Sequence, residues 1–157
     1  MKFIVDLTMG RLAKWLRIAG YDTVFYNSAN PDKLIEIASK EGRMILTRNS
    51  GFIKKKKKTF EEKGIPFLLL TSDRVEDQLK GVAANFKLNL KGNPFTLCID
   101  CNKPLVKISK EDVAGKVPEF VYQNYNKFVQ CSNCKKIFWG GTHKERMEGI
   151  IKAVIEN

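Results

Sequence analysis

Apolar runs and amphipathic segments alternate along the first 94 residues of the chain. Short runs of β-branched, aromatic and other apolar residues predict strands at Lys2–Val5, Thr23–Tyr26, Arg43–Thr47 and Pro66–Thr71. Between them, apolar residues recur at helical spacing and predict helices over residues 9–20, 30–42 and 72–86. Because alternating helices and wholly apolar strands are typical of a parallel sheet packed between helices, the pattern predicts an α/β fold.

The ends of these helices carry their own signals. Gly20 and Gly42 stand where the first two helices should end, and Asn30 precedes a proline at the first helical position. Ser72 or Asp73 is expected to cap the third helix, because both side chains can accept a backbone hydrogen bond there.

The alternation of predicted strands and helices ends after the third helix. Residues 87–93 read as a linker, so we expect an α/β domain over residues 1–92 and a smaller domain over residues 93–157. Near the C-terminus, Thr142 and Glu145 match a capping box. It opens a predicted helix with one apolar face, made of Met147, Ile150, Ile151 and Val154.

All the cysteines of the chain lie in two Cys-x-x-Cys pairs, Cys98 with Cys101 and Cys131 with Cys134. Two such turns supply the four thiolates of a tetrahedral structural Zn²⁺ site. The alternatives are two disulfides or a redox-active pair. The N-terminus, Met-Lys-Phe-Ile-Val-Asp, lacks the pattern of a secretory signal, so we expect a cytoplasmic protein with reduced thiols, which favours zinc.

The formal net charge is +11. A surface this basic favours a polyanionic partner, with nucleic acid ahead of an anionic membrane, although basic residues also serve solubility. No apolar run reaches the length of a membrane span, so we expect no membrane insertion.

Acids and amides follow the predicted strands. Asp6 comes after the first strand, Asp32 at the start of the helix after the second, Asn49 after the third and Asp73 after the fourth. Because the carboxyl ends of parallel strands meet at one edge, these side chains should converge there. Converging oxygen ligands suit Mg²⁺ or Mn²⁺ and metal-assisted phosphoryl chemistry. For Asp32 and Asp73 the alternative is a favourable acid at a helix N-terminus.

The chain resembles the Mut-seven C-terminal ribonuclease family, PIN-like domains with an attached zinc ribbon. The resemblance covers nearly the whole chain. It is carried by Lys2–Asp6, Gly10–Arg17, Gly20–Asp22, Arg43–Arg48, both cysteine pairs, Val117–Pro118, Trp139–His143 and Arg146–Met147. It implies a PIN-like parallel sheet flanked by helices, a small C-terminal four-cysteine zinc ribbon, and metal-dependent RNA cleavage. It matches Asp6 to the first acid of a PIN site, Asp32 to the second and Asp73 to the last.

One position departs from the family pattern. Where the family has Thr-Arg-Asp after the third strand, this chain has Asn49 in place of the aspartate. An amide offers a metal one neutral oxygen, so divalent binding should be weaker. The leading hypothesis is a metal-dependent endoribonuclease that holds Mg²⁺ or Mn²⁺ with Asp6, Asp32 and Asp73. Asn49 would then be a weak fourth ligand or a water-positioning group.

The alternative is a non-catalytic RNA- or ribosome-binding protein, with RNA, including ribosomal RNA, as the partner. A third hypothesis is a protein-interaction module that docks a partner through the ribbon. The candidate RNA contacts are Arg11 and Lys14 on the first helix, Arg48, His143 and a lysine run made of Lys54, Lys55, Lys56, Lys57 and Lys58. A like-charge run usually forms a solvated, mobile loop, but each lysine that meets a phosphate adds affinity.

Overall fold

The computed structural model describes residues 1–156, and its first half is built on a four-stranded parallel sheet. The strands are β1 (Lys2–Val5), β2 (Asp22–Phe25), β3 (Met44–Thr47) and β4 (Phe67–Leu69), in the order β2-β1-β3-β4. Every neighbouring pair is parallel. The predicted α/β fold is therefore confirmed, and β1 lies inside the sheet.

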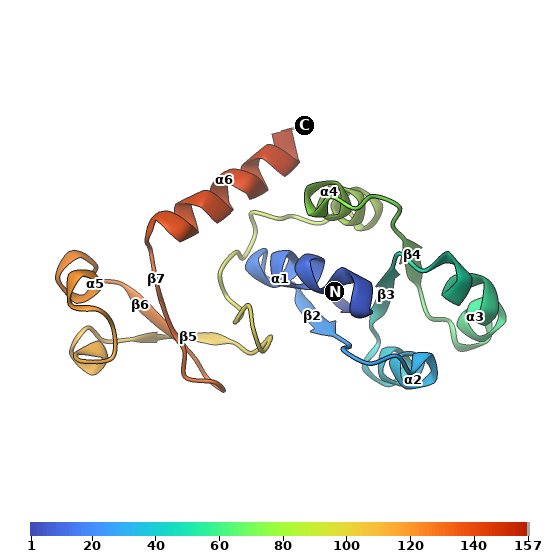
Figure 1. The fold of residues 1–157 in the computed structure, drawn as a ribbon, viewed down its shortest axis with the longest axis horizontal. Helices are drawn as coiled ribbons and strands as arrows, with labels where there is room; N and C mark the ends of the chain where they lie inside the picture. The colour runs from blue at the N-terminus through green and yellow to red at the C-terminus, as the bar shows by residue number, and fades with distance from the viewer. Residues whose placement is uncertain (157) are drawn as a thin grey trace.

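Helices cover both faces of this sheet (Figure 1). The helices α1 (Gly10–Ile18) and α4 (Val75–Phe86) pack with Phe3 and Val5. On the other face, α2 (Pro31–Glu41) and α3 (Ser50–Lys63) pack with Ile4. Phe3, Ile4 and Val5 are all fully buried, because successive residues of a strand point to opposite faces and both faces are covered.

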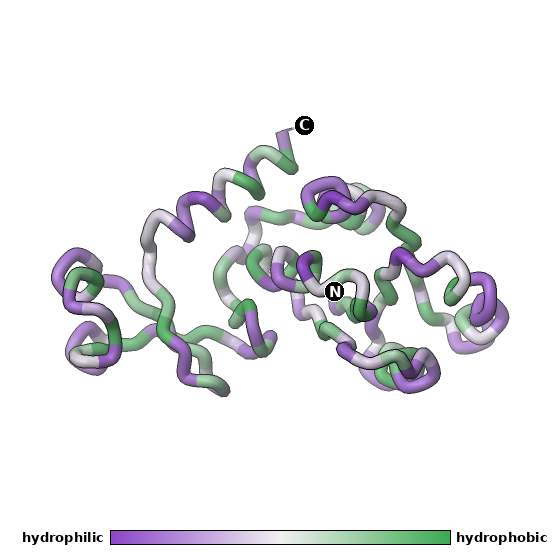
Figure 2. The backbone as a smooth tube through the Cα atoms, viewed as in Figure 1, coloured by the Kyte–Doolittle hydropathy of each residue, from purple (hydrophilic) through white to green (hydrophobic). Residues whose placement is uncertain are grey.

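The helix α3 corrects the prediction of a loop for the lysine run. It begins after Asn49, whose side chain accepts from the Phe52 N–H at 2.9 Å, and ends at Gly64 in the left-handed conformation. Ile53 and Phe60, two turns apart, bury one face of the helix in the core. The lysines between them occupy its other faces, so hydrophilic residues extend along much of α3 (Figure 2).

The expected cap of α4 is also wrong, by one or two residues. The helix begins at Val75 and its cap position is Arg74, without a capping side chain. Ser72 instead accepts from the Arg74 N–H at 3.1 Å and donates to Asp77 at 2.9 Å. Ser72 therefore shapes the turn ahead of the helix.

The second half contains a three-stranded antiparallel sheet. Its strands are β5 (Leu105–Ile108), β6 (Phe128–Cys131) and β7 (Ile137–Trp139), with β6 in the centre. The short 3₁₀ helix η2 (Glu111–Val113) and α5 (Glu119–Asn124) connect β5 to β6. Val113, Val121 and Phe128 form a separate small core there.

The last helix, α6 (Thr142–Glu156), begins within one residue of the start that the capping-box pattern predicted, and it runs back across the molecule to α4 (Figure 1). Ile151 and Val154 join the same core as α1 and α4. The helix of the predicted C-terminal domain thus packs with the first half of the chain. The domain boundary at residue 92 stays a prediction.

Candidate metal centre and nucleic-acid interface

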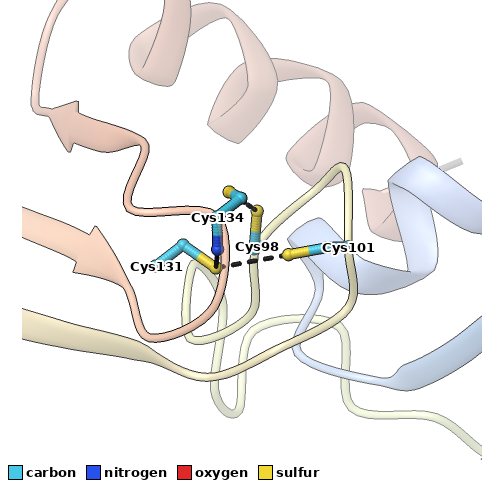
Figure 3. Close-up of side chains that lie close together, drawn as sticks. All are labelled: Cys98, Cys101, Cys131 and Cys134. Carbon is cyan, nitrogen blue, oxygen red and sulfur yellow. Dashed lines mark hydrogen bonds between the residues drawn. The ribbon is translucent and has the colours of Figure 1, made fainter.

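The four cysteines converge at one point between the two halves of the chain (Figure 3). Their sulfur atoms all lie within 4.8 Å of one another, with Cys98 to Cys134 at 3.8 Å and Cys101 to Cys131 at 3.2 Å. Tetrahedral Zn–S bonds of about 2.3 Å place sulfurs about 3.8 Å apart, so this set fits a structural zinc ion. These separations exceed the S–S bond of about 2.05 Å, and the cysteines are free thiols, not disulfides.

Two similar turns present the sulfurs. Asn102 N–H donates to the Cys98 carbonyl at 2.9 Å, and Lys135 N–H donates to the Cys131 carbonyl at 3.2 Å. Both Asn102 and Lys135 have positive φ, which closes each turn tightly behind its cysteine pair. A repeated turn of this kind is typical of zinc knuckles, where each pair supplies two ligands from one side.

The two buried sulfurs lie in different electrostatic settings. Burial raises the pKa of the Cys98 thiol to about 12. Burial also opposes the Cys131 thiolate, but the N–H groups of Cys134 and Asn133 outweigh it and lower the pKa of Cys131 to about 6. A lowered pKa favours the thiolate of Cys131, which is the form that binds metal.

The first cysteine turn is bonded to the parallel sheet. The side chain of Asn102 accepts from the Thr23 N–H at 3.0 Å and donates to Asp22 at 2.6 Å, so it pairs with the edge strand β2. Arg17 of α1 is buried, and its guanidinium donates to the carbonyl of Thr23 at 2.9 Å. The same guanidinium donates to the backbone carbonyl of Asp100 at 3.0 Å. The first cysteine turn is thus held by α1 and β2 as well as by its own hydrogen bonds.

Asp6 lies at the carboxyl end of β1, as predicted, and its carboxylate is held by three donors. One oxygen accepts from the N–H of Thr8 at 2.9 Å and from its hydroxyl at 2.6 Å. The other accepts from the hydroxyl of Thr47, which ends the neighbouring strand β3. These bonds cap the 3₁₀ helix η1 (Leu7–Met9) and fix the carboxylate between two strands.

Two clefts open on either side of η1. The first has a volume of about 550 Å³, and Asp6 shares its wall with Asn49, Lys55 and Lys56. The second has a volume of about 510 Å³ and is lined by charged side chains from both halves of the chain, namely Arg11, Lys14, Arg17, Arg48, Asp73 and Asp100. Leu7 and Thr8 line both clefts, so the two are adjacent.

The other predicted acid-site residues have partners of their own. Asp32 pairs with Lys56 at 2.6 Å, and Asp73 pairs with Arg48. Asn49 uses its amide oxygen to cap α3. Among residues 1–156, the cysteines are the one group of His, Cys, Asp and Glu whose ligand atoms converge at metal-binding distance. Asp6 lines the first cleft, Asp73 lines the second and Asp32 lines neither, so the acids form no such group. Their catalytic role stays a prediction.

The candidate RNA contacts divide by position. Lys55 and Lys56 line the first cleft, and Arg11, Lys14 and Arg48 line the second. Lys54, Lys57 and Lys58 are exposed on α3 but line neither cleft. His143 is exposed on the first turn of α6 and also lines neither cleft.

Sequence reasoning missed the hydroxyls that hold Asp6 and the arginine that holds the first cysteine turn. Thr47 ends a strand beside Asp6, and a threonine there is common enough in strands to carry no signal of its own. An arginine is rarely buried, yet only 6% of Arg17 is exposed. Its burial depends on acceptors 82 and 83 residues further along the chain.

Comparison with known proteins supports the predicted family. The family model described as Mut7-C RNAse domain matches residues 1–151. Neither the curated proteins nor the solved structures contain a significant match to this chain. Among the described residues, no helix has the length and apolar character needed to cross a membrane.

Proposed function

Because the chain belongs to the Mut7-C RNAse domain family, we propose that it binds RNA through the two adjacent clefts at the carboxyl edge of the parallel sheet. The family suggests a ribonuclease-like function. The observation that carries the binding proposal is the set of cations around the clefts. They come from three separate segments, with Lys55 and Lys56 on α3, Arg11 and Lys14 on α1, and Arg48 after β3.

The arrangement of these cations suits a phosphodiester chain. Successive phosphates of a strand carry like charges, so a strand gains most from cations placed along a path. The two clefts share Leu7 and Thr8, so the cations of α1 and those of α3 line neighbouring clefts. The formal net charge of +11 adds long-range attraction for any nucleic acid.

A catalytic Mg²⁺ or Mn²⁺ does not fit the acid site as its donors are arranged. A divalent site of this kind needs free carboxylate oxygens that converge. Asp6 already accepts three hydrogen bonds, while Asp32 and Asp73 each pair with a cation. The amide of Asn49 adds no charge and is already used as a helix cap. The charges at this edge therefore favour phosphate binding over a metal cage.

A binding assay with matched variants tests the proposal. We expect Lys55→Gln/Lys56→Gln and Arg11→Gln/Lys14→Gln each to weaken the affinity for a fluorescent RNA oligonucleotide by about tenfold or more. The control is Lys57→Gln/Lys58→Gln, which removes the same charge from the same helix outside both clefts. Equal losses in the control and in the cleft variants would show that only net charge matters.

Metal-dependent endonucleolytic cleavage is the second candidate function. The observation that favours it is Asp6, a carboxylate fixed by two hydroxyls in the wall of a cleft beside basic side chains. The family's description points the same way. Association with ribosomal RNA or the ribosome, and a cytoplasmic location, stay predictions from the sequence.

A further inference from the structure

Two ion pairs at the cleft edge share one asymmetry. In the pair of Lys56 with Asp32, the lysine side chain is 27% exposed and the aspartate 75%. In the pair of Arg48 with Asp73, the arginine side chain is 32% exposed and the aspartate 83%. The cation is the covered partner in both pairs, and the acid is the exposed one.

This asymmetry makes the acids replaceable. An exposed carboxylate loses little when it returns to water, and pairs of this kind contribute little to stability. The cations, in contrast, lie against cleft walls, Lys56 in the first cleft and Arg48 in the second. A phosphate that displaced either acid would find a cation already positioned for a charge-assisted hydrogen bond.

The guanidinium of Arg48 also has an unused hydrogen-bond donor. Its Nε atom is buried and lacks a hydrogen-bond partner, although its Nη2 atom donates to Asp73. A guanidinium binds phosphate best when two of its N–H groups donate side by side. The single bond to Asp73 leaves that capacity unused.

We propose that Lys56 and Arg48 take the role that a divalent cation has in a metal-dependent site, and that they receive RNA phosphates directly. Asp32 and Asp73 are positioning residues that hold the two cations in place until RNA displaces them. This inference rests on the proposed RNA binding at the two clefts. It makes that binding independent of divalent metal, and it gives the two acids a role opposite to that of metal ligands.

The two possible roles of Asp32 and Asp73, as displaced acids or as metal ligands, predict opposite changes in RNA affinity when the acids are replaced. If Asp32 and Asp73 are displaced by phosphate, removing their charge removes a competitor, and RNA affinity rises without divalent metal. If they are metal ligands, removing their charge lowers the RNA affinity that Mn²⁺ supports. The double variant Asp73→Asn/Arg48→Gln separates a local effect from a general one, because Asp73 can compete only while Arg48 is present.

The experiment measures RNA affinity by fluorescence anisotropy in buffer freed of divalent ions by a resin, so that no chelator reaches the cysteine site. We expect Asp32→Asn and Asp73→Asn each to tighten binding by about two- to fivefold, the factor that corresponds to one surface ion pair. The control is Asp112→Asn in η2, which makes the same charge change outside both clefts and should alter affinity far less. In the Arg48→Gln background, Asp73→Asn should give no gain.

Adding Mn²⁺ at constant ionic strength should leave the wild-type affinity unchanged. Weaker binding by the two aspartate variants, or tighter wild-type binding with Mn²⁺, would overturn this inference and leave RNA binding intact. Failure of the wild type to bind RNA with or without Mn²⁺ would overturn the proposed function, and this inference with it. A gain from Asp73→Asn that persists without Arg48 would also overturn the inference.

Discussion

The guanidinium of Arg17 in α1 donates a hydrogen bond to the backbone carbonyl of Ile99, between the first two cysteines, at 2.8 Å. This bond joins the core of the parallel sheet to the metal centre. Asp100, which follows Ile99, lines the second cleft. One short turn therefore carries two of the four clustered cysteines, contacts α1 and forms part of the cleft wall.

The first prediction concerns the metal itself. Purified protein should contain about one zinc ion per chain, because the four sulfurs fit a tetrahedral site. Cys98→Ser should release the zinc, since Cys98 is fully buried and the hydroxyl is a poorer ligand than a thiolate. Elemental analysis gives the stoichiometry, and hydrogen exchange shows where protection is lost. A zinc-free protein with an intact antiparallel sheet would contradict this prediction.

The second prediction concerns Arg17. Replacing it with glutamine should lower the free energy of unfolding by about 2–3 kcal/mol, because three backbone carbonyls in buried or part-buried positions lose their donor. Urea denaturation measures the change. Lys14→Gln is the matched control, since Lys14 lies one turn away on the exposed part of the same helix. We also expect Arg17→Gln to weaken zinc retention, which a colorimetric release assay would detect.

The third prediction concerns Gly20, which has a φ of +87° and lies against the backbone of the connecting segment. A Cβ atom there would come within 2.1 Å of the Asn93 carbonyl oxygen. At Gly42, with a φ of +62°, a Cβ atom would meet nothing within 4 Å. Both alanine variants incur the left-handed penalty of about 1–2 kcal/mol. Gly20→Ala should cost about 2 kcal/mol more in unfolding free energy, because backbone must move.

Thermal or urea unfolding of the two glycine variants, prepared in parallel, gives this difference directly. Subtracting one loss of unfolding free energy from the other cancels the left-handed backbone penalty that the two sites share. The difference that remains is the cost of the clash between the new Cβ atom and Asn93. Equal losses would show that the connecting segment yields easily at Asn93. The contact between the two halves would then be adaptable at that point.

The parallel sheet was predictable because its signals are local. The buried face of each strand and the glycines that end helices appear within a few residues of one another, as in β1 and at Gly42. The candidate zinc site was equally predictable, since two Cys-x-x-Cys pairs in one chain have few other functions. The loop predicted for the lysine run failed because Ile53 and Phe60, which anchor α3, are separated by charged residues that hide the helical period.

The site was less predictable because it depends on pairings between distant segments. Nothing near Asp6 in sequence indicates that Thr47 donates to it from the end of the neighbouring strand. Nothing near Asp32 indicates that Lys56, on the next helix, neutralises it. Sequence placed the acids at the correct edge of the sheet, but the partners of each acid follow only from the packing of α2 against α3 in one shared core.

The fourth prediction concerns the salt dependence of RNA binding. If Lys55 and Lys56 meet phosphates, Lys55→Gln/Lys56→Gln should flatten the slope of log affinity against log salt by about 1.4 units for single-stranded RNA. Lys57→Gln/Lys58→Gln should leave the slope nearly unchanged, because those side chains face solvent beside Glu61 and Glu62. Anisotropy titrations at several salt concentrations measure both. The same change of slope in both variants would place the RNA along all of α3.

The fifth prediction decides between the two candidate functions, and it rests on Asp6. If the clefts bind RNA without cutting it, wild-type protein should release no fragments from end-labelled RNA above background at any Mn²⁺ concentration. Asp6→Asn should then keep RNA affinity within about threefold, since the cations of the clefts remain. It should also cost some stability, because the hydroxyls of Thr8 and Thr47 lose a charged acceptor.

Cleavage would give a different set of results. Wild-type protein would cut RNA only with Mn²⁺, Asp6→Asn would abolish the fragments, and Asn49→Asp would increase them by restoring a carboxylate beside Asp6 in the first cleft. Asn49→Asp is an informative variant because aspartate also caps helices, so the start of α3 is preserved. Cleavage that survives Asp6→Asn would exclude this carboxylate from the reaction. A wild type that is inactive while Asn49→Asp cuts RNA would show that the amide at position 49 alone separates a binding protein from a nuclease.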